Sequence, residues 1–333
     1  MSPPKPFPIL RLPFLAIEEV FKAMDPIEII NFSMISKRTK EIGKRMSFYP
    51  NYAIELYVHE MPEIRLHGTK DVVSSFYVMT SDKEMDGKIE EKEWGRYIIR
   101  KVFKYDPIDE WKQWFKYVME IFRKQAIDVL TMTLTTFVDQ NVSIIDFLKS
   151  NVKSVDRCSL YQRDEQINVD KHTAYLLDNV KINSELCYDA YINNDDFNPK
   201  IPKSLQELRI YNSKWIEYER LLEIDCKSVI LKNNPISNKE WNVFVKKWRV
   251  METNQNVEYL ELDYREIKEF QELVLHDIPH EVVDRGVRRV LKTRRNKTKE
   301  ISGGIDIRRI DGKTATFFVY HTSRIQFFAM SIH

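Results

Sequence analysis

The chain has 333 residues and a mass of 39.9 kDa, with 43% hydrophobic, 12% aromatic and 31% charged residues and a formal net charge of +2. This composition excludes disorder on a large scale and predicts a folded protein of about two domains. No stretch approaches the ~18 consecutive apolar residues of a membrane helix, because two prolines and an arginine interrupt the apolar run at residues 7–17. We therefore expect no membrane partner and a cytoplasmic and/or nuclear location.

Cysteine and glycine usage argues against several classes of site. The three cysteines, Cys158, Cys187 and Cys226, are too far apart and odd in number for a disulfide framework or a Cys-x-x-Cys zinc site. Only eight glycines occur, and none lies between Gly95 and Gly286, so glycine-rich phosphate-binding loops are absent from that span. No motif pairs a nucleophile with a base. We expect a protein that is not an enzyme and that uses no metal and no cofactor.

The first fifty residues predict three short helices. The chain begins with a proline-rich leader at residues 1–8. Pro13 then suits the first turn of a helix. A stripe at helical spacing then predicts one amphipathic helix, and its members are Ile17, Val20, Phe21 and Met24. The run Asp25-Pro26-x-Glu28 is typical of an N-cap, a proline at N1 and a capping glutamate, so a second helix follows directly. A basic stretch at 37–45 predicts the third.

The spacing of these positions resembles an F-box. The matching segments are Leu-Pro at 12–13, Val-Phe at 20–21, Met24, Glu-Ile-Ile at 28–30 and Phe-Ser-Met-Ile-Ser-Lys-Arg at 32–38. The chain departs from the family pattern at Leu15, where an acidic residue is often found, and at Thr39, where an aromatic residue is frequent. An unrelated helical hairpin that caps the following domain is the alternative.

The F-box resemblance implies a partner. F-boxes dock onto the Skp-type adaptor of a cullin-RING ubiquitin ligase, and through it onto cullin. The physics agrees, because three helices in so few residues bury too little surface alone and an exposed apolar patch is typical of an interface. The residues expected to contact the adaptor are Leu12, Pro13, Val20, Phe21, Met24, Ile29, Ile30, Ile35, Ser36 and Lys37.

From about residue 50 the sequence predicts strands. Tyr52 to Val58 alternates, residues 75–79 form a second apolar run, and an apolar-x-x-apolar-x-apolar triplet then recurs. Its copies are Ile127/Leu130/Met132, Val155/Cys158/Leu160, Leu205/Leu208/Ile210, Cys226/Val229/Leu231 and Val257/Leu260/Leu262, with a weaker one at Leu186/Tyr188/Ala190. Amphipathic helical patterns separate several copies. Together they predict an irregular leucine-rich-like α/β solenoid, with Cys158 and Cys226 buried as small hydrophobes.

The alternation of the triplets also predicts the strand residues that point away from the core. They are Thr131, Thr133, Ser159, Tyr161, Arg209, Tyr211, Ile230, Lys232, Glu261 and Asp263. We expect a concave face that binds a protein substrate through Tyr161, Arg209, Tyr211, Lys232, Glu261 and Asp263. An ordinary solvated surface is the alternative.

The C-terminal pattern is antiparallel. Alternation from Ile305 to Arg309, then Asp311-Gly312, then alternation from Thr314 predicts a hairpin with a two-residue turn, and residues 325–329 predict a third strand. The Asp-Ile-Arg-Arg strand at 306–309 and its turn resemble the type 2 F-box-associated domain of expanded nematode-type F-box families, over about residues 190–333. This resemblance implies substrate binding.

Two further motifs favour other functions. Residues 82–93 overlay an EF-hand loop, but the preceding segment predicts a strand and no second loop exists, so a polar turn is the better interpretation. Residues 285–299 carry eight basic residues and no acidic one. No aromatic residue lies among them, so we interpret the run as a solvated basic helix or loop, with nucleic-acid binding as the less favoured alternative.

The sequence therefore predicts an α+β protein in three parts. These are the leader at 1–8, an F-box at 9–48 and a substrate-recognition domain at 50–333, in which an antiparallel hairpin caps the solenoid. The predicted function is the substrate-recognition subunit of an SCF-type ubiquitin ligase. The alternative is a nucleic-acid-binding protein or a non-ligase scaffold that uses the basic run at 285–299 or the solenoid face.

Overall fold

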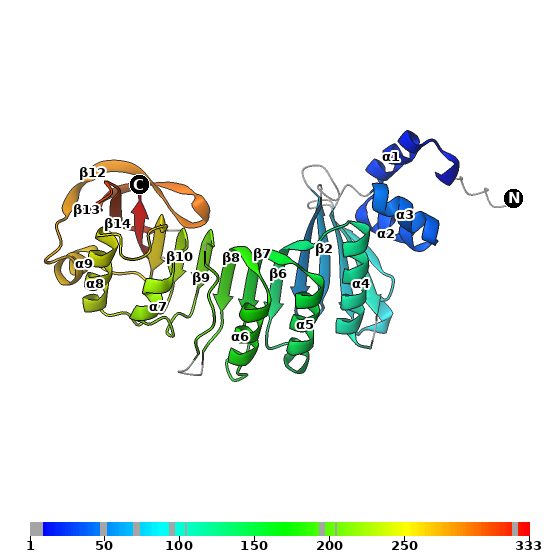
Figure 1. Cartoon of the computed structure of the whole chain (residues 1–333), viewed down its shortest axis with the longest axis horizontal. Helices are drawn as coiled ribbons and strands as arrows, with labels where there is room; N and C mark the ends of the chain where they lie inside the picture. Colours follow the sequence, from blue (N-terminus) through cyan, green and yellow to red (C-terminus); the bar gives the residue numbers. More distant parts are fainter. Residues whose placement is uncertain are drawn as a thin grey trace. The chain divides into compact units, whose positions relative to one another are not determined.

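The computed structural model of the protein describes residues 9–46, 52–68, 74–92, 97–103, 105–192, 197–203, 205–321 and 326–333. The proline-rich leader lies outside these residues. The chain forms two compact units, an N-terminal unit of Met1–Met132 with Asp146–Ser154 and a C-terminal unit of Thr133–Ile145 with Val155–His333. An F-box with three helices is followed by a mixed α/β sheet, as predicted (Figure 1). Within the described ranges, no helix is long and apolar enough to cross a membrane.

The helices of the F-box begin where the sequence predicts. After a short 3-10 turn η1 (Ile9–Arg11), α1 (Phe14–Ala23) and α2 (Pro26–Met34) are joined by the predicted cap. The Asp25 side chain accepts the Glu28 N–H at 2.9 Å, and the Glu28 carboxylate accepts the Asp25 N–H at 3.0 Å. Helix α3 (Lys37–Met46) starts after Ser36, whose hydroxyl and N–H both bond Thr39. Thr39 is therefore a buried capping residue.

The N-terminal unit holds a mixed sheet of six strands in the order β6, β1, β2, β3, β5, β4. Its strands are β1 (Tyr52–Val58), β2 (Glu63–Gly68), β3 (Ser74–Thr80), β4 (Ile89–Lys92), β5 (Tyr97–Phe103) and β6 (Ala126–Thr133). Helix α4 (Pro107–Ile121) buries Trp111 and Phe115, and both rings contact Phe147 of α5 (Asn141–Asn151). The Trp111 indole N–H donates to the Glu63 carbonyl at 3.1 Å, so α4 is fixed to the first residue of β2.

The EF-hand-like segment is a turn in the structure. Residues Lys83–Met85 form the 3-10 helix η3, capped by the Asp82 side chain, and β4 follows directly. The Asp86 carboxylate accepts the Phe103 N–H at 3.0 Å. The last position of the motif, Glu93, lies outside the described residues. Among those described, no group of three or more His, Cys, Asp or Glu side chains is placed to hold a metal ion.

The C-terminal unit is built on parallel strands that alternate with helices (Figure 1). Strands β7 (Ser154–Tyr161), β8 (Ile182–Asp189), β9 (Glu207–Ile210), β10 (Ser228–Leu231) and β11 (Tyr259–Leu262) pair in this order. The 3-10 helix η4 (Val138–Gln140) precedes these strands, and the helices between or after them are α6 (Asp170–Asn179), α7 (Tyr218–Glu223), α8 (Asn238–Arg249) and α9 (Ile267–Val274). All of the predicted triplet residues are buried, including those of the weaker copy on β8. The sequence did not predict α6 and α9.

The three cysteines of the chain are all buried, two of them, Cys158 and Cys226, as triplet residues. Cys158, Cys187 and Cys226 are free thiols in the interior. Burial raises the pKa of the Cys158 thiol well above its ordinary value and that of Cys226 to about 12. Both remain thiols at neutral pH, as expected of structural cysteines.

The C-terminal segment adds four antiparallel strands, β12 (Glu281–Lys292), β13 (Thr298–Arg308), β14 (Thr314–His321) and β15 (Gln326–Ile332). The chain order is not the sheet order, because β15 pairs with β11 and continues through β14 and β13 to β12. Residue 325, the predicted start of the last strand, lies outside the described residues.

The predicted two-residue turn between β13 and β14 is wrong. The Arg309 N–H donates to the Lys313 carbonyl and the Gly312 N–H to the Arg309 carbonyl, which leaves three residues in the turn. The reason lies at Arg309, which is buried against the Trp248 ring and bonds both Asp311 oxygens at 3.0 and 2.7 Å. Gly312 takes φ 92°, a conformation that favours glycine.

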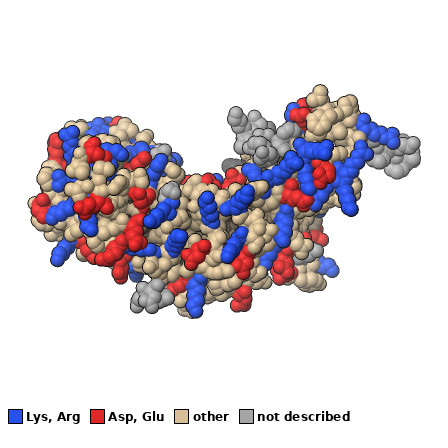
Figure 2. Space-filling model, in the orientation of Figure 1, with Lys and Arg blue, Asp and Glu red and all other residues tan. Residues whose placement is uncertain are grey.

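The interpretation of residues 285–299 as a solvated helix or loop is also wrong. The run forms most of β12, the 3-10 turn η5 (Arg294–Asn296) and the start of β13. Four of its cations are paired: Arg288 with Glu300, Arg289 with Asp306, Lys292 with Glu258 and Arg294 with Glu261. On the face displayed in Figure 2, basic and acidic side chains are interspersed over the C-terminal unit.

The β12–β13 hairpin covers one face of the C-terminal sheet. Leu291 and Ile301 from the hairpin share a buried cluster with Ile230, Tyr259, Phe318, Tyr320, Phe327 and Ala329. On the other side of β14 and β15, the Phe270 ring of α9 lies 4.9 Å from Phe317 and 4.7 Å from Phe328. These strands are therefore packed on both faces.

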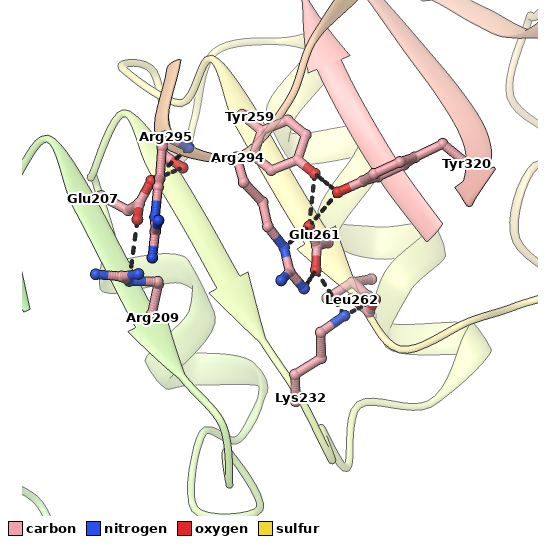
Figure 3. A network of polar contacts seen from close by, with 10 residues as sticks. Glu207, Arg209, Lys232, Tyr259, Glu261, Leu262, Arg294, Arg295 and Tyr320 are labelled. Atoms are coloured by element: carbon pink, nitrogen blue, oxygen red, sulfur yellow. Dashed lines mark hydrogen bonds and ion pairs between the residues drawn. The ribbon is translucent and has the colours of Figure 1, made fainter. Parts of the chain in front are cut away.

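A buried carboxylate fixes the tip of this hairpin (Figure 3). Glu261 of β11 has no exposed surface, and its oxygens bond Lys232 Nζ at 2.9 Å and Arg294 Nε at 2.5 Å. The hydroxyls of Tyr259 and Tyr320 each donate to Glu261 Oε2 at 2.8 Å. Burial acts to raise the pKa of Glu261, but the hydrogen bond from Arg294 and the charge of Lys232 outweigh it and hold the pKa below its ordinary value.

Three residues predicted to point to solvent are buried: Thr133, Ile230 and Glu261. The alternation itself is correct at Ile230 and Glu261, which face away from the triplet core. At these two positions the prediction fails because the hairpin returns over that face, which no local pattern encodes.

We expect Glu261→Gln to lower the free energy of unfolding by ~3–5 kcal/mol at pH 7, because two cations then lose their only buried carboxylate. Urea denaturation measures the loss. The native carboxylate has a depressed pKa, so its contribution is present above the ordinary carboxyl pKa of ~4.3 and disappears as the pH falls below that value. The difference between native protein and variant should therefore shrink at acid pH.

The control is Glu272→Gln on the exposed side of α9, which should change stability by less than ~0.5 kcal/mol. Equal stability of the two variants at pH 7 would show that Glu261 does not hold the hairpin.

Candidate protein-interaction surfaces

The structure divides the ten residues predicted to bind an adaptor into an inner and an outer set. Phe21, Ile29 and Ile30 are buried within the N-terminal unit, and the Phe21 ring packs edge-on against Phe32 at 5.2 Å. The half-buried or exposed members are Leu12, Pro13, Val20, Met24, Ile35, Ser36 and Lys37. Phe21, Ile29 and Ile30 are packed in the interior of this unit, so their contact with an adaptor stays a prediction that their burial does not favour.

The outer apolar surface of the F-box includes Ile35 and three side chains outside the ten predicted contact residues: Phe14, Leu15 and Met34. At the start of α1, Phe14 is 61% and Leu15 74% exposed. At the end of α2, Met34 is 47% and Ile35 73% exposed. We call these four residues the F-box apolar edge. Large exposed hydrophobic side chains on adjacent short helices are typical of a protein interface. Leu15 stands where the family often has an acidic residue, so this departure adds to the exposed apolar surface.

The F-box is anchored to helix α4 through the opposite side of α2 and α3 (Figure 1). Ser33 Oγ lies 3.0 Å from the Tyr117 hydroxyl, and Lys40 lies over the Tyr117 ring at 4.8 Å. Lys40 and Lys44 each contact a Glu120 oxygen at 2.8 Å. The hydrogen bonds from these lysines lower the pKa of Glu120. The F-box therefore packs on the first helix of the following domain.

The residues predicted to bind substrate do not form one surface. Tyr161, Arg209, Tyr211 and Lys232 are half-buried, Asp263 is exposed and Glu261 is buried. Lys232 is committed to Glu261, and the Asp263 carboxylate accepts the Asn233 N–H at 2.6 Å. Of these six residues, Arg209 lines a cavity that the described part of the C-terminal unit forms.

This cavity, which we call the charged cleft, has a volume of about 750 Å3. It lies against strands β7 to β11 and the hairpin tip, with Arg157, Glu185, Gln206, Glu207, Arg209, Lys227, Ser228, Glu258, Tyr259, Lys292, Thr293 and Arg295 lining it. Sequence analysis missed it because it joins five strands to the tip of a distant hairpin. The only local signal was the predicted outward orientation of Arg209.

Two carboxylates, Glu185 and Glu207, and Arg209 form the floor of the cleft, and Figure 3 shows Arg209 beside Glu207. Arg209 Nε lies 3.1 Å from Glu207 Oε1, and Arg209 Nη2 lies 3.3 Å from Glu185. The other Glu207 oxygen accepts the backbone N–H of Arg295 at 3.0 Å. Glu207 is buried, and its negative charge is neutralised by Arg209. Its second oxygen is bonded to the backbone of the hairpin tip.

Comparison with known proteins agrees with this architecture. The F-box domain family model matches residues 9–51, which include all three N-terminal helices. The family model described as F-box associated matches residues 196–262, the segment of β9, β10 and β11 with α7 and α8. The predicted signature at 306–309 lies beyond that match.

A relative from Caenorhabditis elegans, the Skn-1 dependent zygotic transcript 15 protein, is 21% identical over 289 residues. The alignment covers 77% of this chain and 81% of the relative. No solved structure matches the chain. On the evidence of the two domain matches and of the helices and strands that occupy them, the chain contains an F-box domain at residues 9–51 and an F-box-associated region at residues 196–262.

Proposed function

We propose that the protein is the substrate-recognition subunit of an SCF-type cullin-RING ubiquitin ligase. In this proposal the F-box binds the Skp-type adaptor, which binds cullin, and the C-terminal unit binds a protein target. The observation that carries the proposal is the F-box apolar edge, because Phe14, Leu15, Met34 and Ile35 remain exposed while the opposite side of the F-box packs on α4.

The role that we propose is proximity and not chemistry. A ligase subunit of this kind holds a target lysine near a ubiquitin-loaded enzyme and so raises the effective concentration of the reactants. The contacts of α4 with Ser33, Lys40 and Lys44 suit that role, since they reduce the freedom of the F-box relative to the sheet of the N-terminal unit. We propose a reducing location, the cytoplasm and/or the nucleus, which agrees with the three buried free thiols.

We further interpret the strand-helix units from β7 to β11 as leucine-rich-like repeats and the strands β12 to β15 as their cap. Each unit buries its triplet on the same side, and a lone unit of this kind cannot bury its apolar face. A cap then protects the exposed last strand from pairing with another chain.

We expect the double variant Leu15→Asp/Ile35→Asp to weaken binding of a purified Skp-type adaptor at least ~100-fold, because two apolar contacts are replaced by desolvated carboxylates. Biolayer interferometry with immobilised adaptor measures the affinity. The matched control is Val142→Asp/Leu273→Asp, two exposed apolar residues of the C-terminal unit. Binding by the control and not by the F-box variant supports the proposal, whereas a folded native chain that does not bind overturns it.

We expect Ile29→Asp to act by a different route. Ile29 is fully buried, so an unpaired carboxylate there should destabilise the F-box itself by ~3 kcal/mol or more. Thermal unfolding should show a lower Tm for this variant, while Leu15→Asp/Ile35→Asp keeps the native value. An unchanged Tm for Ile29→Asp would contradict the inner position of this residue.

A further inference from the structure

The charges that line the cleft indicate which class of ligand it can bind. Five cations and three carboxylates line it, which gives a net charge of +2. The carboxylates are already engaged: Glu185 and Glu207 by Arg209, and Glu258 by Lys292. The cleft therefore offers positive charge to a ligand. Its carboxylates are already paired within the protein, so they are not available to bind a cationic ligand.

The unengaged positive charge comes from three exposed side chains, Arg157, Lys227 and Arg295. Within the described part of the chain, none of the three has an ion-pair partner. They come from β7, the segment before β10 and the hairpin tip, so they approach the cleft from three separate elements. This arrangement differs from a run of like charges along one strand, because the fold alone brings the three together.

The floor of the cleft has the geometry of an extended site. Arg157, Glu185, Glu207, Ser228 and Tyr259 are register partners across five parallel strands, so their side chains form one row on the same face of the sheet. Four inter-strand steps of ~4.8 Å make this row ~19 Å long, the length of about six residues of extended chain. A short peptide segment matches that length better than a single free anion does.

The hairpin tip holds Arg295 in an unusual conformation. Its φ is 55°, in the left-handed region that few residues other than glycine and asparagine adopt. The Thr293 N–H bond to the Lys297 carbonyl at 2.7 Å and the Arg295 N–H bond to Glu207 maintain it. An arginine in such a strained position on the wall of a cleft is a feature associated with binding sites.

We propose that the charged cleft binds a segment of the target protein that carries clustered negative charge, held by Arg157, Lys227 and Arg295. The inference rests on the proposed function, because it names the substrate class of the same recognition domain. Carboxylates of Asp and Glu or phosphates on Ser and Thr supply the same chemistry, since guanidinium and ammonium groups bind both.

The test is fluorescence anisotropy with three labelled twelve-residue probes of Gly and Ser: one with six glutamates, one with two phosphoserines and one neutral. A short oligothymidine is the fourth probe. We expect at least one acidic peptide to bind at least ~10-fold more tightly than the neutral peptide, with an affinity that falls as salt is added. A preference between the glutamate and phosphoserine probes identifies the source of the charge.

The variant Arg157→Gln/Lys227→Gln/Arg295→Asn should weaken acidic-peptide binding ~10-fold or more. Asparagine at 295 tolerates the left-handed backbone, so the tip should keep its conformation and the Tm should not fall. The matched control, Lys171→Gln/Lys214→Gln/Lys239→Gln, removes the same charge from exposed lysines outside the cleft and should change affinity by less than ~2-fold.

Three results would overturn the inference: no preference for either acidic peptide, an equal loss in the control variant, or tighter binding of the oligothymidine than of both acidic peptides. Adaptor binding by the same samples separates the two proposals. Adaptor binding without acidic-peptide binding rejects the cleft inference alone, and acidic-peptide binding without adaptor binding rejects the ligase role alone.

Discussion

The Glu261 carboxylate is the interaction on which the C-terminal unit depends. A carboxylate without exposed surface is stable only if it is paired and hydrogen-bonded, and Glu261 meets both conditions through Lys232, Arg294, Tyr259 and Tyr320. These four partners come from β10, β11, the hairpin tip and β14. The network therefore forms only when the β12–β13 hairpin has returned over the parallel strands. The apolar cluster of Leu291 and Ile301 then seals the same face.

Closure by the hairpin decides where this unit can bind a partner. The face of β10 and β11 that a strand pattern assigns to solvent becomes core, since Ile230 and Glu261 lie beneath the hairpin. The row from Arg157 to Tyr259 lines the cleft beside the tip: Arg157 is exposed, Glu185 and Ser228 are half-buried, and Glu207 and Tyr259 are buried. Glu207 links the two regions, because its carboxylate accepts the Arg295 N–H and contacts Arg209. The buried Glu261 carboxylate thus fixes the hairpin over one part of the face, and the buried Glu207 carboxylate positions Arg209 and the hairpin tip at the cleft.

The parts of this fold that were predictable are those encoded by local patterns. The capping box at Asp25 and Glu28, the alternation of β1 and the buried triplets all follow from residues within one turn or one strand. The basic run at 285–299 was misinterpreted partly because two of its cations, Lys292 and Arg294, pair with Glu258 and Glu261, which a chain pattern cannot associate with the run. Likewise, Ile29 and Ile30 have the composition of an interface but are buried within the N-terminal unit.

The packing of the F-box on α4 has a consequence for how an adaptor would be held. The Ser33–Tyr117 contact and the two lysine contacts of Glu120 join α2 and α3 to a helix that Trp111 fixes to β2. Surface ion pairs contribute little stability, so the two lysine contacts of Glu120 add little to the strength of this packing. The buried part of the joint includes Ser33, whose hydroxyl contacts Tyr117 of α4. An adaptor on the F-box apolar edge would therefore move together with the sheet of the N-terminal unit.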